Sequence, residues 1–122
     1  MILVDTSVWI RHFAQRSSSI DVARRKEGIL THPLVIGELA CGLVSNRRQH
    51  LADLFLLPRA IDVPNVQVQT FIEQERLWGK GIGILDAHLL ASAVQTGCTL
   101  WTFDAALERA AARLRLTYTP RR

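Results

Sequence analysis

The sequence predicts an α/β fold in which helices cover both faces of a parallel sheet, and three observations support that prediction. Short apolar runs alternate along the chain with stretches of helical periodicity, as in consecutive strand–helix units. The chain has 122 residues, 48% of them hydrophobic, which is enough for one ordinary core. No low-complexity tract, repeat or linker interrupts residues 1–122, so we expect a single domain.

The first part of the chain supplies two expected strands and two expected helices. Ile2–Val4 is an uninterrupted apolar run, as expected of a parallel strand that is buried on both faces. Thr6 or Ser7 is a suitable cap for the helix that follows, because a hydroxyl can accept a hydrogen bond from a free backbone N–H. Residues 28–31 predict a second strand. A histidine and a proline then lead into a helix over residues 34–44, since proline suits a first helical turn.

The middle of the chain adds two helices and one strand. A helix over residues 47–57 is expected to end before the proline that follows it. Residues 60–63 are expected to form a third strand. Asn65 is a candidate cap for a helix that reaches residue 78, and the glycines of residues 79–83 indicate a loop.

The last third of the chain repeats the strand–helix pattern. Residues 85–96 predict a helix that stops at a glycine. Residues 99–103 are rich in side chains of high β-propensity and predict a strand. A final helix over residues 105–114 leads to a short edge strand near residues 117–118.

Charge and cysteine usage limit the class of protein. The formal net charge is +4, and all but two of the cationic residues are arginine, which is compatible with a polyanionic partner. The basic pairs and triplets are expected to be solvated: Arg24-Arg25-Lys26, Arg47-Arg48 and Arg121-Arg122. Cys41 and Cys98 lie far apart in hydrophobic stretches, so we expect buried free thiols and no metal-binding pair.

The sequence gives no sign of a membrane or secretory protein. No apolar run approaches the roughly 18–20 residues that a membrane-spanning helix needs. The N-terminus has no basic region and reaches Asp5 too early for a signal peptide. We therefore expect a cytoplasmic protein.

Two of the eleven acidic residues follow expected strands. Asp5 follows Ile2–Val4, and Asp104 follows residues 99–103. Ligands bind beyond the carboxyl ends of the strands in open parallel sheets, so both acids are expected at a site. The alternative for either acid alone is a helix cap. Seven acids are expected to be solvated: Asp21, Glu27, Asp53, Asp62, Glu73, Glu75 and Glu108.

Glu38 and Asp86 are placed differently, on the apolar faces of their expected helices. Neighbours three and four positions from each of them are mainly apolar. An unpaired buried carboxylate is unfavourable by several kcal/mol, so it needs a partner. The structural alternatives are a buried salt bridge to arginine for Glu38 and a helix cap for Asp86.

Convergence of these four acids would require a counter-charge, because like charges raise each other's pKa values. A divalent cation would supply it. Oxygen ligands without a nearby histidine or cysteine set suit Mg²⁺ or Mn²⁺, and the four histidines share no ligand spacing that would indicate zinc.

The order of the four acids along the chain and the residues around each of them resemble those of PIN domains, and specifically of toxins of the VapC type. The similarity extends over essentially the whole chain. It rests on residues 1–10 (MILVDTSVWI), 38–43 (ELACGL), 83–91 (GILDAHLLA) and 99–104 (TLWTFD).

The resemblance implies a sheet of about five parallel strands and an endoribonuclease that depends on Mg²⁺ or Mn²⁺. Its acidic site would comprise Asp5, Glu38, Asp86 and Asp104. Thr6 or Ser7, and Thr102, would position metal-bound water as second-layer residues. Water would attack the RNA phosphodiester in line and leave a 5′-phosphate.

The resemblance also implies partners. It implies a cognate antitoxin protein and a homodimer formed through helices, and a tRNA or rRNA loop is a reasonable target. Two departures concern the surroundings of the site. Apolar residues follow Asp104 where relatives often carry polar or aromatic ones, and Arg11 and His12 replace a frequent acid and are possible phosphate contacts.

Other functions fit the residues less well. Phosphatases of the haloacid dehalogenase type need a second acid two residues after the first, where this chain has Ser7. Receiver domains need paired early acids and a late lysine. A non-catalytic RNA-binding or scaffold protein would not need all four acids. A DNA nuclease could use the same chemistry, but this chain has no room for the added arches or clamps of structure-specific enzymes.

Overall fold

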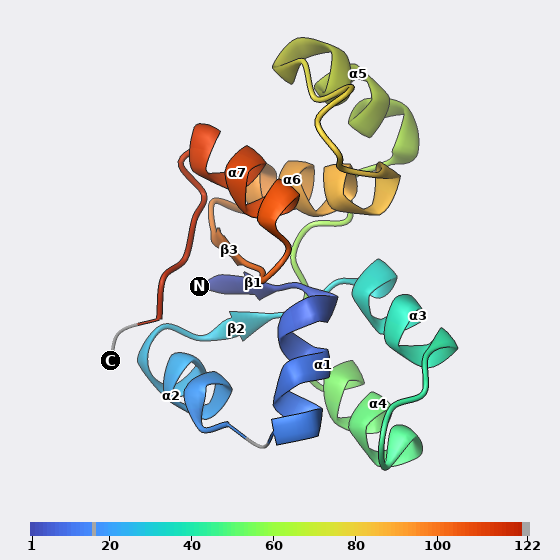
Figure 1. The fold of residues 1–122 in the computed structure, drawn as a ribbon, viewed down its shortest axis with the longest axis vertical. Coiled ribbons are helices and arrows are strands. Elements are labelled where there is room, and N and C mark those ends of the chain that lie inside the picture. The colour runs from blue at the N-terminus through green and yellow to red at the C-terminus, as the bar shows by residue number, and fades with distance from the viewer. Residues whose placement is uncertain (16, 121–122) are drawn as a thin grey trace.

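The computed structural model describes residues 1–15 and 17–120, and a small parallel sheet lies at its centre (Figure 1). The Arg121-Arg122 pair lies outside the described residues. In chain order the elements are β1 Ile2–Val4, α1 Thr6–Gln15, α2 Ser19–Lys26, β2 Ile29–Leu30, α3 Pro33–Cys41, α4 Arg47–Phe55, α5 Asn65–Glu75, α6 Ile84–Thr96, β3 Thr99–Trp101 and α7 Ala105–Arg113.

The sheet has β1 in the middle and runs in the order β2-β1-β3, with all neighbours parallel. The predicted α/β class is therefore confirmed. β1 is completely buried, which explains why Ile2–Val4 is apolar without alternation. Val4 is in register with Trp101, so the residues that follow β1 and β3 leave the sheet at the same level.

The expected count of about five strands is only roughly met. Beyond the three strands, one parallel bridge joins Thr31 to Arg59 and another joins Leu100 to Thr117, one on each edge. The expected strand over residues 60–63 is reduced to the first of these bridges. After the bridge at Arg59 the backbone leaves the sheet, because the N–H of Ile61 donates to the Thr96 hydroxyl (2.9 Å) and not to a neighbouring strand.

Helices surround this sheet on both sides of β1 (Figure 1). α3 packs against α1 and α4, α6 packs against β3, and α5 packs against α6. The longest helix among the described residues, α6, has 13 residues. No helix in this part of the chain has both the length and the apolar character needed to cross a membrane.

Several helix boundaries differ from the sequence predictions. Neither Thr6 nor Ser7 caps α1, because the helix already begins at Thr6 and the Asp5 carbonyl accepts its first hydrogen bonds. α2 was not predicted as a separate helix. α5 ends at Glu75, since Arg76 adopts a left-handed conformation (φ 53°). The glycine stop after α6 is confirmed, with Gly97 at φ 74°.

Two side-chain predictions in these elements are wrong. Asn65 does not cap α5; its side-chain oxygen lies 3.1 Å from Nε2 of His88 on α6. Cys98 is buried as expected, whereas Cys41 is exposed because it is the last residue of α3, on the side that faces solvent.

A buried histidine caps the helix that carries Glu38. His32 has no exposed surface, and its Nδ1 accepts a hydrogen bond from the N–H of Leu34 (3.0 Å). Burial lowers the pKa of His32; Asp62, 3.5 Å away, acts in the opposite direction, and His88 and Arg59 lower the pKa further. The imidazole is therefore held neutral, which keeps Nδ1 available as an acceptor.

His32 is expected to make the fold sensitive to mild acid. A group with a lowered folded pKa contributes stability above its unfolded pKa and loses it as the pH falls. We expect the free energy of unfolding to decrease below about pH 6.5. Urea titrations at pH 7.5, 6.5 and 5.5 measure this. His32→Asn keeps a capping acceptor without the titration, so its stability should fall less steeply. Equal slopes in the two proteins would contradict the assignment to His32.

Candidate active site

The four acids predicted from the sequence come from four different elements. Asp5 follows β1, Glu38 lies on α3, Asp86 lies in the first turn of α6, and Asp104 precedes α7. Because β1 and β3 are parallel neighbours, their carboxyl ends bring Asp5 and residues 102–104 to the same edge of the sheet.

Asp5 is the buried member of the group and accepts two side-chain hydrogen bonds. Its side chain is buried, and its Oδ2 accepts hydrogen bonds from the hydroxyls of Ser7 (2.7 Å) and Thr102 (2.8 Å). The Ser7 oxygen in turn accepts from the N–H of Phe103 (3.0 Å), and the Thr102 oxygen accepts from the N–H of Asp104 (3.0 Å). The two hydroxyls therefore tie the start of α1 to the chain that follows β3.

Glu38 lies beside this group but is not buried. Its Oε1 accepts a hydrogen bond from Thr6 (3.3 Å), while the residue as a whole is exposed. The expectation of a carboxylate on a buried apolar face is therefore wrong; the side chain is exposed and meets Thr6, the residue after Asp5. Partial desolvation raises the pKa of Glu38, Asp5 and Asp86 raise it further, and the Thr6 hydroxyl opposes the shift.

Asp86 is half-buried and has two sets of interactions. Its Oδ2 accepts from the N–H of Gly83 (3.3 Å), so it closes the first turn of α6. Desolvation raises the pKa of Asp86; the Gly83 hydrogen bond opposes this, and the charges of Asp5 and Asp104 raise the pKa further. The capping alternative considered from the sequence is thus present together with the electrostatic contact to the other acids.

Asp104 also caps a helix. Its Oδ1 accepts from the N–H of Leu107 (2.9 Å) at the start of α7, while its charge acts on Asp86. One aspartate can cap a helix and also belong to the site, because Asp86 and Asp104 each use only one carboxylate oxygen for the cap.

The four acids form one electrostatic group around Asp5, since Asp5 raises the pKa of Glu38 and of Asp86, and Asp104 raises that of Asp86. Within the described residues, no lysine or arginine lies within 4.0 Å of an acidic side chain, and the His32–Asp62 contact involves a neutral imidazole. The arginine partner considered for Glu38 is therefore not found in this part of the chain.

An all-oxygen donor set without a protein counter-charge fits a hard divalent cation. As they stand, no three histidine, cysteine, aspartate or glutamate side chains of the described residues lie close enough to hold a metal ion. Asp5 and Asp104 each have one carboxylate oxygen without a hydrogen bond in this structure, so the donors that a cation would use are available.

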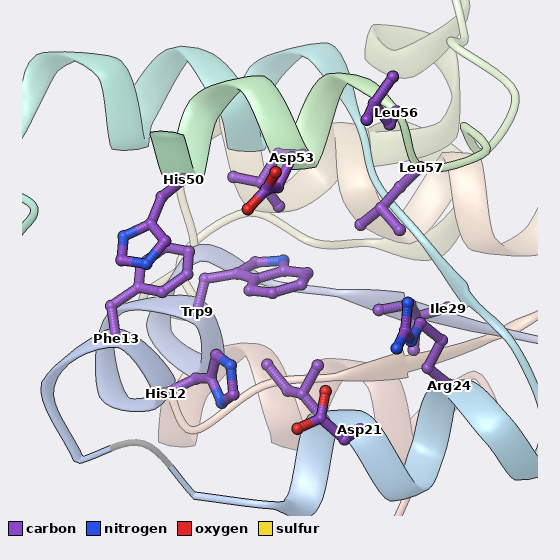
Figure 2. A pocket seen from close by; sticks show the side chains of 12 residues that line it. Trp9, His12, Phe13, Asp21, Arg24, Ile29, His50, Asp53, Leu56 and Leu57 are labelled. Carbon is purple, nitrogen blue, oxygen red and sulfur yellow. The ribbon is translucent and has the colours of Figure 1, made fainter. Parts of the chain in front are cut away.

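A cavity of about 500 Å³ lies elsewhere, between α1, α2 and α4 (Figure 2). Trp9, Phe13 and His50 contribute its aromatic side chains, and the Phe13 and His50 rings stack with centroids 3.9 Å apart. None of the four acids lines this cavity, so it is separate from the candidate active site.

A model of the PIN domain family matches residues 2–113 of this chain. The chain belongs to the PIN domain family. The resemblance to VapC-type PIN proteins is confirmed by a relative, ribonuclease VapC32 of Mycobacterium tuberculosis, found in two strains. The chain is 40% identical to it over 116 residues, which cover 92% of this chain and 91% of the relative.

Two solved structures have the same PIN fold. One is the crystal structure of PAE2754 from Pyrobaculum aerophilum, where the match covers 93% of this chain and 88% of the PAE2754 chain. The other is the crystal structure of FitAcB from Neisseria gonorrhoeae, where the match covers 92% of this chain and 94% of the matched chain. Each has a TM-score of 0.60 at 21% identity, so the likeness supports the fold alone. The region matched by the PIN family contains all four acids.

Repulsion within the acidic group leads to a stability prediction for Glu38→Gln. A raised carboxyl pKa means that the charged form is unfavourable in the fold, so stability is lost as the pH rises through that pKa. In EDTA at pH 8 we expect the variant to melt slightly higher than the parent, by about 1–3 °C. The gain should disappear near pH 4, where Glu38 is protonated in the parent protein as well.

The matched control is Glu73→Gln, an exposed acid on α5, for which we expect no change. A melting temperature several degrees lower for Glu38→Gln would instead mean that Glu38 stabilises the fold through an ion pair, and would argue against repulsion.

Proposed function

We propose that this chain is an endoribonuclease that depends on Mg²⁺ or Mn²⁺ and uses Asp5, Glu38, Asp86 and Asp104 to hold the metal. The observation that carries the proposal is the convergence of acids from four elements around Asp5, with no lysine or arginine of the described residues within 4.0 Å of them. The 40% identity of this chain to ribonuclease VapC32, over nearly its whole length, supports RNA as the substrate.

The acids have distinct local supports for this role. Asp5 is fixed by Ser7 and Thr102, which leaves its Oδ1 free to face a ligand. Glu38 is oriented by Thr6, and Asp104 is held by the backbone at the start of α7. These supports limit the side-chain rotation that would otherwise weaken binding, as is usual for residues that orient metal ligands.

A divalent cation bound here would supply a Lewis acid for a phosphate oxygen and lower the pKa of a coordinated water. The bound charge would also offset the repulsion that raises the pKa values of Glu38 and Asp86. Water from solvent would then hydrolyse the phosphodiester, and the product would carry a 5′-phosphate.

The biological role that fits this activity is that of a toxin in a toxin–antitoxin pair. The relation to ribonuclease VapC32 supports the toxin role, and it also supports a cognate antitoxin protein as a partner. A tRNA or rRNA loop as target, a homodimer, a single domain over residues 1–122 and a cytoplasmic location belong to the same proposal.

Cleavage of RNA by the purified chain tests the proposal directly. Total tRNA and a generic single-stranded RNA are incubated with Mg²⁺, Mn²⁺ or EDTA, and products are resolved by length and end group. An Asp5→Asn, Asp104→Asn double variant controls for contaminating nucleases. We expect cleavage with either metal, none with EDTA, and none with the double variant.

Cleavage that survives EDTA or the double substitution would contradict the site. If no RNA is cut in any buffer, calorimetric titration with Mn²⁺ separates two cases. Metal binding without cleavage would indicate that the target is missing from the RNA pool. A protein that binds RNA but no metal would favour the non-catalytic binding role.

A further inference from the structure

An arginine and a phenylalanine form a stacked pair on the surface beside the candidate active site. The guanidinium carbon of Arg11, on α1, lies 3.9 Å from the centre of the Phe103 ring. Phe103 is 40% exposed, and Arg11 is exposed. The pair therefore presents an aromatic plane and a delocalised cation to solvent.

The backbone of the acidic site fixes this pair in position. Phe103 lies between Thr102, which donates to Asp5, and Asp104. The N–H of Phe103 donates to the Ser7 oxygen (3.0 Å). The ring also meets Trp101 edge to face, with centroids 6.3 Å apart. The Phe103 backbone is therefore one hydrogen bond away from Ser7, which donates to Asp5, and one residue away from Asp104.

Arg11 is held by the Phe103 ring and not by an acid of the described residues. No acidic side chain of the described residues lies within salt-bridge distance of Arg11, although the chain carries acids on most of its helices. Arg11 and Phe103 line a cavity of about 240 Å³ with Val8, Gln15 and Trp101, and this cavity adjoins the acidic site only through the backbone of Phe103, since none of the four acids lines it. This volume is smaller than the roughly 300–1,000 Å³ of sites for drug-sized ligands, and it suits a single planar ring.

We infer that Arg11 and Phe103 bind a nucleobase of the RNA strand next to the bond that is cut. The inference rests on the proposed function and names a base-binding position for the same site. Bases of single-stranded RNA stack on aromatic rings and on arginine planes, and such stacking tolerates any base. The Arg11 charge also attracts the neighbouring phosphate, which the four acids alone would repel.

Binding measured without metal tests this base position separately from cleavage. The probe is a fluorescein-labelled oligouridylate of twelve nucleotides, titrated in EDTA and followed by fluorescence anisotropy. A second probe has the same length and an abasic backbone. We expect Phe103→Ala to weaken oligouridylate binding roughly five- to hundredfold and to leave binding of the abasic probe unchanged. Phe103→Tyr, which keeps the ring, should bind like the parent protein.

Arginine variants separate stacking from charge. Arg11→Gln should flatten the dependence of log K on log salt concentration by about 0.7, because one phosphate contact is lost. Arg11→Lys should keep that slope and lose part of the preference for the oligouridylate over the abasic probe. The matched control is Phe55→Ala on α4, since Phe55 is an exposed ring with Arg59 at 5.9 Å and lies on a helix without any of the four acids.

The results distinguish the two proposals. Unchanged oligouridylate binding in Phe103→Ala, an equal loss with both probes, or the absence of binding by the parent protein would overturn the base position. If the parent protein cuts RNA while Phe103→Ala binds normally, the nuclease proposal stands and the base position fails. If Phe103 governs base binding in a protein that cuts no RNA, the base position stands and the nuclease proposal fails.

Discussion

Asp5→Asn is expected to reduce metal-dependent RNA cleavage by more than about 100-fold and to leave the fold intact. Loss of a partner that merely orients a metal ligand typically lowers affinity or activity 10- to 100-fold, so loss of a ligand should exceed that. The amide oxygen of asparagine can still accept from Ser7 and Thr102, which now donate to Asp5 Oδ2. Its NH₂ group would then occupy the position of Oδ1, where it repels a cation.

Initial cleavage rates in Mn²⁺ and thermal unfolding in EDTA measure the two halves of this prediction. The melting temperature should equal or exceed that of the parent protein, because a buried charge has been removed. Asp21→Asn, an exposed acid on α2, is the matched control and should cleave normally. If Asp5→Asn cleaves RNA normally, Asp5 does not belong to the site. If Asp5→Asn is unfolded, Asp5 has a structural role.

Thr102→Val is expected to damage both the site and the fold. The substitution keeps the shape of the side chain but removes one of the two donors to Asp5 and the acceptor for the N–H of Asp104. Thr102 is buried, so water cannot readily replace these hydrogen bonds. We expect a loss of about 1–3 kcal/mol in the free energy of unfolding and a 10- to 100-fold lower cleavage rate.

Thr102→Ser retains the hydroxyl and should stay close to the parent protein in both measurements. Urea unfolding in EDTA gives the stability, and initial rates with saturating Mn²⁺ give the activity. If serine and valine behave alike, the methyl group and its packing matter more than the hydroxyl, and Thr102 does not orient Asp5.

Apart from α2 and the expected strand over residues 60–63, the sequence predicted the order of the elements, and it predicted the edge of the sheet where Asp5 and Asp104 lie. Ile2–Val4 and residues 99–101 are apolar runs that end in or near an aspartate, and parallel pairing places those ends together. Asp86 was recognised by a different signal, its place on the apolar face of its expected helix. The roles of the acids in metal binding stay predictions.

The errors arose where tertiary contacts decide the outcome. Periodicity placed Glu38 on an apolar face, but that face of α3 is exposed at Glu38 and Cys41. The burial of Cys41 was predicted wrongly for a similar reason. Cys41 is the last residue of α3, and the burial of a last helical turn depends on how the following chain covers it. Helix α2 is only eight residues long and carries three cations, so its buried Ile20 and Ala23 gave too short a pattern to predict it.

Phe103 was the residue that periodicity could not single out. It reads as one more strand residue after Trp101, and only its exposed ring and its contact with Arg11 from a distant helix distinguish it. Arg11 itself was noted as a possible phosphate contact. The structure adds that it shares a surface with an aromatic ring adjoining Asp104.

The hydrogen bond from Thr102 to Asp5 spans 97 positions of the chain. A ribosome that adds about 5–20 residues per second therefore needs roughly 5–20 seconds to deliver the second partner after the first. During that interval the growing polypeptide has an unsupported Asp5 and lacks Asp104 altogether. A nascent copy of this protein thus carries an incomplete acidic site while it is still surrounded by ribosomal and transfer RNA, and the site can assemble only after Asp104 has been added.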